Sequence, residues 1–84
     1  MHEKEIGKFT HYFGHVSAGI IELSDSLKIG DKIHIKGYTS DFMQNVISMQ
    51  VEHTVISEAK SGDHVGIKVS EKVHQGDKVY KIIA

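Results

Sequence analysis

Residues 59–69, Ala59-Lys60-Ser61-Gly62-Asp63-His64-Val65-Gly66-Ile67-Lys68-Val69, contain the two patterns that decide the fold. The second half places an apolar residue at every other position, which is the period of a strand with one buried face. The first half ends in Gly-Asp immediately before that strand. Glycine can adopt positive φ and aspartate can accept a local backbone N–H, so the pair predicts a corner that turns the chain into the strand.

The same corner occurs twice more, as Gly30-Asp31 within residues 27–33 and as Gly76-Asp77 within residues 73–79. Each copy again stands just before an apolar strand pattern. Carboxylates that bind a metal must converge on one point, whereas these aspartates precede three separate strands. We therefore predict a structural role for them.

Alternation of apolar and polar residues also marks Ile33-His34-Ile35-Lys36 and residues 47–52. Gly37-Tyr38-Thr39-Ser40 is predicted to form a hairpin turn, and residues 55–60 have room for one helical turn. The complete prediction has six strands, at about residues 5–13, 15–23, 32–36, 41–53, 64–70 and 78–83. The bulky interior candidates are Phe9, Phe13, Phe42, Met43 and Met49, and Tyr12 and Ile21 are candidates for outward apolar residues.

An open sheet of six antiparallel strands would leave two unpaired edges, and closing the sheet removes them while turning the apolar face inward. The sequence therefore predicts an all-β fold, a closed six-stranded antiparallel β-barrel. Eighty-four residues with 39% hydrophobic content suit one small domain, so residues 1–84 are predicted to form a single domain.

The composition excludes several classes of protein. There is no cysteine for a disulfide or a zinc–thiolate site, and ten lysines with no arginine face eleven acidic residues, which disfavours strong nonspecific nucleic-acid binding. No apolar run reaches the roughly 20 residues of a membrane-spanning helix, and the first residues are too charged for a signal peptide. We predict a cytoplasmic protein with no membrane contact and no cofactor.

Catalytic and metal-binding constellations are weak. Glu52-His53 and Asp63-His64 pair a histidine with a carboxylate, but neighbours on a strand point to opposite faces and cannot relay a proton directly. His11 and His15 would lie roughly 13 Å apart on an extended chain, too far to share one ion unless Gly14 folds the strand back. We predict no catalytic residue, no metal site and no enzyme.

Four segments together resemble the second, β-barrel domain of translational GTPases of the elongation factor Tu type. They are Gly7-x-x-Thr10-x-x-x-Gly14-x-Val16, Leu27-Lys28-Ile29-Gly30-Asp31, residues 48–53 and residues 58–66. The resemblance spans nearly the whole chain and implies the elongation-factor domain 2 type of barrel. The phosphate-binding loop of the GTPase domain is absent, so no nucleotide binding is predicted.

The chain departs from the family pattern at positions that meet the aminoacyl end of tRNA. His64 replaces the usual asparagine after Gly-Asp, His15 replaces an arginine, Phe9 replaces a glycine, and His53 stands where many members carry a basic residue. The resemblance thus makes His53, His64 and His15 candidate ligand or RNA contacts. Lys36 and Tyr38 are further candidates, because a lysine and an aromatic residue adjoin at a hairpin tip.

The function predicted on this basis is a non-catalytic binding module associated with translation or RNA handling, with tRNA or the ribosome as partner. The alternative is a protein-docking accessory domain, since similar barrels occur at the end of collagenase-like peptidases and a separate copy could dock onto such an enzyme. The oligomeric state is left open.

Overall fold

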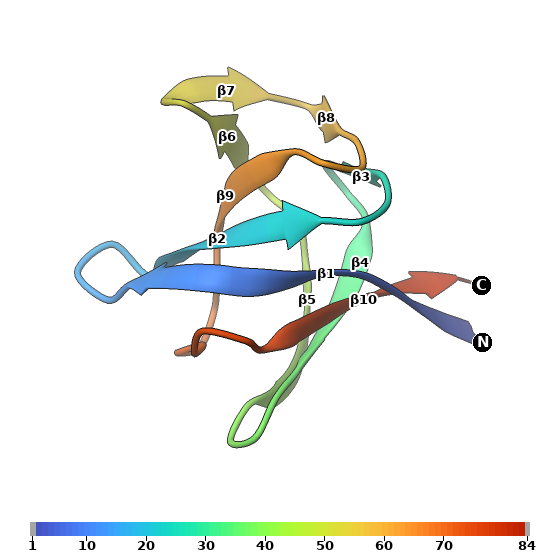
Figure 1. Cartoon of the computed structure of the whole chain (residues 1–84), viewed down its shortest axis with the longest axis vertical. Helices are drawn as coiled ribbons and strands as arrows, with labels where there is room; N and C mark the ends of the chain where they lie inside the picture. Colours follow the sequence, from blue (N-terminus) through green and yellow to red (C-terminus); the bar gives the residue numbers. More distant parts are fainter. Residues whose placement is uncertain (1, 84) are drawn as a thin grey trace.

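The computed structural model describes residues 2–83 and folds them into ten β-strands, with no helix among these residues (Figure 1). The prediction of an all-β fold is confirmed. The strands are β1 (His2–Phe13), β2 (Ala18–Leu23), β3 (Leu27–Lys28), β4 (Lys32–Lys36), β5 (Asp41–Asn45), β6 (Met49–Val51), β7 (Thr54–Ile56), β8 (Glu58–Ala59), β9 (His64–Lys68) and β10 (Lys78–Ile83).

Eight strands form one antiparallel sheet in the order β5-β4-β10-β1-β2-β9-β6-β7, and β3 pairs with β8 in a second, two-stranded sheet. Figure 1 shows β1 and β2 crossing the middle of the molecule, with β6 and β7 on one side and the β4–β5 hairpin on the other. β5 and β7 are the edges of the large sheet, and no ladder between them closes it within residues 2–83. The closed six-stranded barrel is therefore not confirmed.

A single strand over residues 41–53 was the wrong prediction, because the chain changes partners in the middle of this stretch. β5 pairs with β4 as far as Asn45, whereas β6 pairs with β9. Between them Val46 is buried, its N–H donates to the Asp31 carbonyl at 2.8 Å, and its own carbonyl accepts from the Gly30 N–H at 2.8 Å. This detour shifts the phase of the alternation. Ile47 is 73% exposed, although it has the same apolar alternation as residues 49 and 51.

The edge strand β5 is joined to the segment after β9 by one side chain. The Gln44 amide donates from Nε2 to the Lys68 carbonyl at 2.7 Å and accepts at Oε1 from the Ser70 N–H at 2.8 Å. A neighbouring strand would satisfy such a carbonyl and N–H with the backbone of one residue. Gln44 thus substitutes for a ladder at the place where the large sheet remains open.

The predicted helical turn in residues 55–60 is also wrong. These residues contain β7 and β8, and β6 and β7 are joined by a hairpin in which Val51 pairs with Thr54. The pairing partners β6 and β3 hold the segment extended, and tertiary pairing of this kind overrides a weak local preference for helix.

The three Gly-Asp corners are confirmed and nearly identical. Gly30, Gly62 and Gly76 have φ of 95°, 93° and 93°. The Oδ2 atom of the following aspartate accepts the backbone N–H three residues earlier, at 3.0 Å for Asp31, 3.0 Å for Asp63 and 2.9 Å for Asp77. The hairpin turn predicted at residues 37–40 is present too, between β4 and β5.

Phe9, Phe42 and Met49 are buried in the core as predicted, but Phe13 and Met43 are 41% and 52% exposed. A bulge in the β1–β2 ladder between Phe9 and His11 reverses the alternation of β1. As a result Tyr12 packs against the core and Phe13 points outward. Ile21 is fully buried, so the prediction of Tyr12 and Ile21 as outward residues was wrong.

Candidate functional site

A groove of about 710 Å³ runs over the outer face of β2, β9 and β6. One wall is formed by the end of β1 and the β1–β2 loop, which contribute Phe13 and Val16, and the opposite wall is the β6–β7 turn, which contributes Glu52 and His53. Figure 1 shows the loop and the turn at the same end of the molecule. Since Phe13 and Val16 are 41% and 45% exposed, an apolar surface borders the groove.

The floor of the groove depends on two glycines that face opposite ways. A Cβ at Gly19 would lie 2.6 Å from Cε1 of the buried Phe9, so this position faces the core and has no room for a side chain. A Cβ at Gly66 would have the Gln50 carbonyl oxygen as nearest neighbour at 3.8 Å. Gly66 therefore leaves the floor open, and a side chain there would fill the groove without touching the core.

Backbone strain is concentrated at the walls of the groove. Three non-glycine residues among 2–83 have positive φ: Ser17 at 52°, Glu52 at 50° and His53 at 66°. Glu52 and His53 line the groove, and Ser17 lies between two lining residues of the opposite wall. The Gly-Asp corners, in contrast, have glycine at their positive-φ positions. Backbone strain of this kind clusters at functional sites in proteins.

The β6–β7 turn gives a direct test of this strain. Its two central residues have the conformation of a two-residue hairpin turn that favours Asn-Gly, so replacing Glu52 by Asn and His53 by Gly is expected to raise the free energy of unfolding by about 1–2 kcal/mol. Urea denaturation measures the change. The control, Glu52→Ala with His53→Ala, removes the same side chains but keeps the strain, and equal stability of the two variants would contradict the assignment.

The predicted contact residues do not form one cluster. His53 and His64 both line the groove, but among residues 2–83 the His64 ring pairs with Glu22, with Nε2 3.2 Å from Oε2, and not with His53. His15 is exposed in the β1–β2 loop beside the lining residue Val16. Lys36 and Tyr38 belong to the β4–β5 hairpin, which Figure 1 places at the far side of the molecule from β6 and β7.

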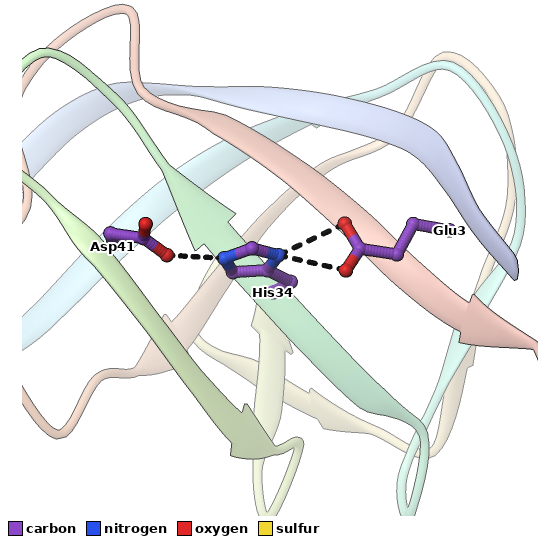
Figure 2. A network of polar contacts seen from close by, with 3 residues as sticks. All are labelled: Glu3, His34 and Asp41. Atoms are coloured by element: carbon purple, nitrogen blue, oxygen red, sulfur yellow. Dashed lines mark hydrogen bonds and ion pairs between the residues drawn. The ribbon is translucent and has the colours of Figure 1, made fainter. Parts of the chain in front are cut away.

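Apart from the groove, a polar cluster that was not predicted surrounds His34 on β4 (Figure 2). Its Nδ1 lies 2.9 Å from Oε1 of Glu3, and its Nε2 lies 2.5 Å from Oδ1 of Asp41. Each carboxylate accepts a hydrogen bond from a different ring nitrogen, so the arrangement requires the doubly protonated imidazolium. His34 is 9% exposed, and the network ties the start of β1 to β4 and β5.

Hydrogen bonds to Asp41 and then to Glu3 raise the pKa of His34 above its ordinary value, although burial opposes the rise. The hydrogen bond from His34 in turn lowers the pKa of Asp41. The sequence did contain a signal for part of this cluster. In a hairpin that pairs Lys36 with Asp41, the side chain of Asp41 lies on the same face as that of His34, two residues away.

Neither set of residues has the geometry of a metal centre, since no group of three or more histidine, aspartate or glutamate side chains within residues 2–83 is arranged to hold an ion. Ser48 lines the groove together with His53 and His64, but its hydroxyl makes no hydrogen bond to either ring in the described part of the chain. Over the same residues the structure has no helix able to span a membrane.

Comparison with known proteins shows where similar chains occur. The chain is 43% identical over 77 residues to an uncharacterized protease of Methanocaldococcus jannaschii, and 35% identical over 78 residues to a collagenase of Porphyromonas gingivalis. Each match covers 90% of this chain but only 19% and 22% of the relative. The chain thus spans about a fifth of the length of these relatives. No family model matches it.

The fold agrees with a solved structure. The C-terminal domain of a putative U32 peptidase of Geobacillus thermoleovorans superposes with a TM-score of 0.89 at 16% identity, over 95% of this chain and 93% of that chain. These findings overturn the resemblance to the second domain of elongation factors and the RNA-binding prediction drawn from it. Short Gly-Asp corners and alternating strands are shared by many small β-folds, which explains the error. By both sequence and fold, this chain is similar to part of peptidases and collagenases.

Proposed function

We propose that this chain is a non-catalytic accessory domain that docks onto a polypeptide partner through the groove. The observation that carries the proposal is the extent of the matches: nearly all of this chain corresponds to about a fifth of a protease and a collagenase. In those relatives the matching segment belongs to a polypeptide about five times its length. The open, partly apolar groove with its strained walls gives the module a surface for such contact.

Non-catalytic action is part of the proposal. The histidines of the groove have no cysteine nearby, because the chain contains none, and Ser48 has no base within hydrogen-bonding distance among the described residues. The His34 network holds its ring between two carboxylates, which leaves neither nitrogen free to take up a proton. Binding therefore accounts for these side chains better than acid–base chemistry does.

The proposal is tested by titrating the M. jannaschii protease, made without its matching segment, with this chain in a calorimeter. We expect saturable binding with a Kd in the range of about 1–100 μM, typical of a modest interface. The protease's own excised segment is titrated in parallel as the reference. Absence of binding by this chain contradicts the proposal, whether or not the reference segment binds.

Gly66→Val separates docking through the groove from docking elsewhere. The new methyl groups occupy the floor while the fold is kept, because valine suits a strand and the Cβ has room. We expect a loss of about a hundredfold in affinity for the truncated protease, which corresponds to about 2.7 kcal/mol, with an unchanged melting temperature. Lys32→Val, an exposed strand position of β4 outside the groove, is the matched control and should bind normally.

A further inference from the structure

The side chains on the outer face of the groove lie in rows that cross β2 and β9. Strand pairing places Ala18 beside Lys68, Ile20 beside Gly66, and Glu22 beside His64. Successive rows are two residues apart on each strand. An extended polypeptide repeats its side chains on one face with the same two-residue period, so such a chain lying along the strands would match the rows one by one.

The middle row, Ile20 and Gly66, offers an apolar surface with room for a side chain of the partner. Gly66 has no side chain and lies between Ile20 on β2 and Gln50 on β6, which pair with it on either side. Phe13 and Val16 add exposed apolar surface at the loop wall. One large aliphatic side chain of a partner, placed over Gly66, would cover this surface and contact Ile20.

The two outer rows differ in charge. Lys68 lines the groove at one end and forms no ion pair with any residue of the described range 2–83. At the other end Glu22 already pairs with His64, and Glu52 adds a further carboxylate at the wall. A carboxylate of the partner is therefore attracted at the Lys68 end and repelled at the Glu22 end, which fixes the end of the groove at which an acidic residue of the partner lies.

We propose that the groove binds an extended segment of a protein partner that carries a large aliphatic residue over Gly66 and an acidic residue two positions away against Lys68. The inference rests on the proposed docking function and specifies the chemistry of the partner. Both side chains project from the same face of the extended segment. The residue between them points to solvent and is free to vary.

The test uses acetylated, amidated seven-residue peptides with ¹⁵N-labelled protein. The core of each peptide is Leu-Ser-Glu or Glu-Ser-Leu, and the controls replace Glu by Lys or Leu by Ser, all flanked by Gly and Ser. We expect amide shifts at residues 18–20 and 66–68, with a Kd on the order of 1 mM, because a free peptide loses its conformational freedom on binding. At least one Leu/Glu peptide should bind about tenfold more tightly than its Leu/Lys counterpart.

Variants make the assignment specific. Lys68→Glu should reverse the preference so that the Leu/Lys peptide binds more tightly, and Gly66→Val should abolish the shifts with every peptide. Lys32→Glu makes the same charge change outside the groove and should leave the preference intact. Equal binding of the acidic and basic peptides, or shifts confined to other strands, would overturn the inference.

The two proposals fail in different ways. If the truncated protease binds but Lys68→Glu has no effect on that binding and the peptides cause no shifts, docking stands and the inferred segment is wrong. If the peptides bind as expected but the protease does not, the groove recognises such segments and the proposed partner is wrong.

Discussion

Phe9→Ala is expected to lower the free energy of unfolding by about 3–5 kcal/mol, which is a large part of the 5–15 kcal/mol that stabilises a typical domain. Phe9 is 1% exposed, and its ring lies directly against the backbone of Gly19 beneath the groove. Removing the ring leaves a cavity that the paired strands β1 and β2 cannot collapse to fill. Equilibrium urea denaturation, followed by tyrosine fluorescence or circular dichroism, measures the loss.

Gly19 provides the other half of this test. An alanine Cβ there would lie 2.6 Å from the Phe9 ring and 3.2 Å from the His11 carbonyl oxygen, so Gly19→Ala should cost about 1–3 kcal/mol through overpacking. Combining it with Phe9→Leu, which frees space, should cost less than the sum of the two single changes. Gly66→Ala is the matched control and should be neutral or slightly stabilising. A similar cost at Gly19 and Gly66 would refute the packing described.

His34→Phe is expected to lower the free energy of unfolding by about 2 kcal/mol near pH 6, because it removes two charge-assisted hydrogen bonds while keeping a ring of similar shape. The Glu3 and Asp41 side chains are 39% and 68% exposed, so water can replace part of the hydrogen bonding that these carboxylates lose with the His34 ring. The measurement is a series of urea titrations of both proteins from pH 5 to pH 10.

The difference between the two proteins should shrink as the pH rises. Because the pKa of His34 is raised in the folded state, its contribution is fully present below the unfolded value of 6.5 and is lost as the pH passes through the folded value. The lowered pKa of Asp41 acts oppositely, with stability lost in acid. Glu3→Gln with Asp41→Asn should flatten the dependence above pH 6. A difference that grows with pH would be inconsistent with an imidazolium between two carboxylates.

The elements that could be predicted from the sequence are those fixed by local chemistry. A Gly-Asp pair specifies its own conformation, so all three corners and the strands that follow them were found, and β4 and β10 have the predicted bounds. Apolar alternation also identified β9. These features depend on neighbouring residues in the chain, which is the information that a single sequence contains.

The errors arose where pairing between distant strands decides the structure. The apolar residues 47, 49 and 51 alternate in the opposite phase to the buried residues of β5, and the chain leaves β4 for β9 at Val46. Local alternation does not show which strand each part pairs with. The bulge that turns Phe13 outward is likewise a property of the β1–β2 ladder. His53 and His64 were predicted as contact residues and both line the groove, but its floor depends on Gly66, which has no side chain to attract notice.

The way β1 and β10 pair has a consequence for how this module can be connected to other polypeptides. His2 and Ile83 are partners in adjacent antiparallel strands, so the chain enters and leaves at neighbouring points (Figure 1). Both points lie at the end of the molecule opposite the β1–β2 loop. The module can therefore be inserted into a host protein as a cassette, or closed into a ring by a short linker, with the β1–β2 loop that borders the groove at the end away from the junction.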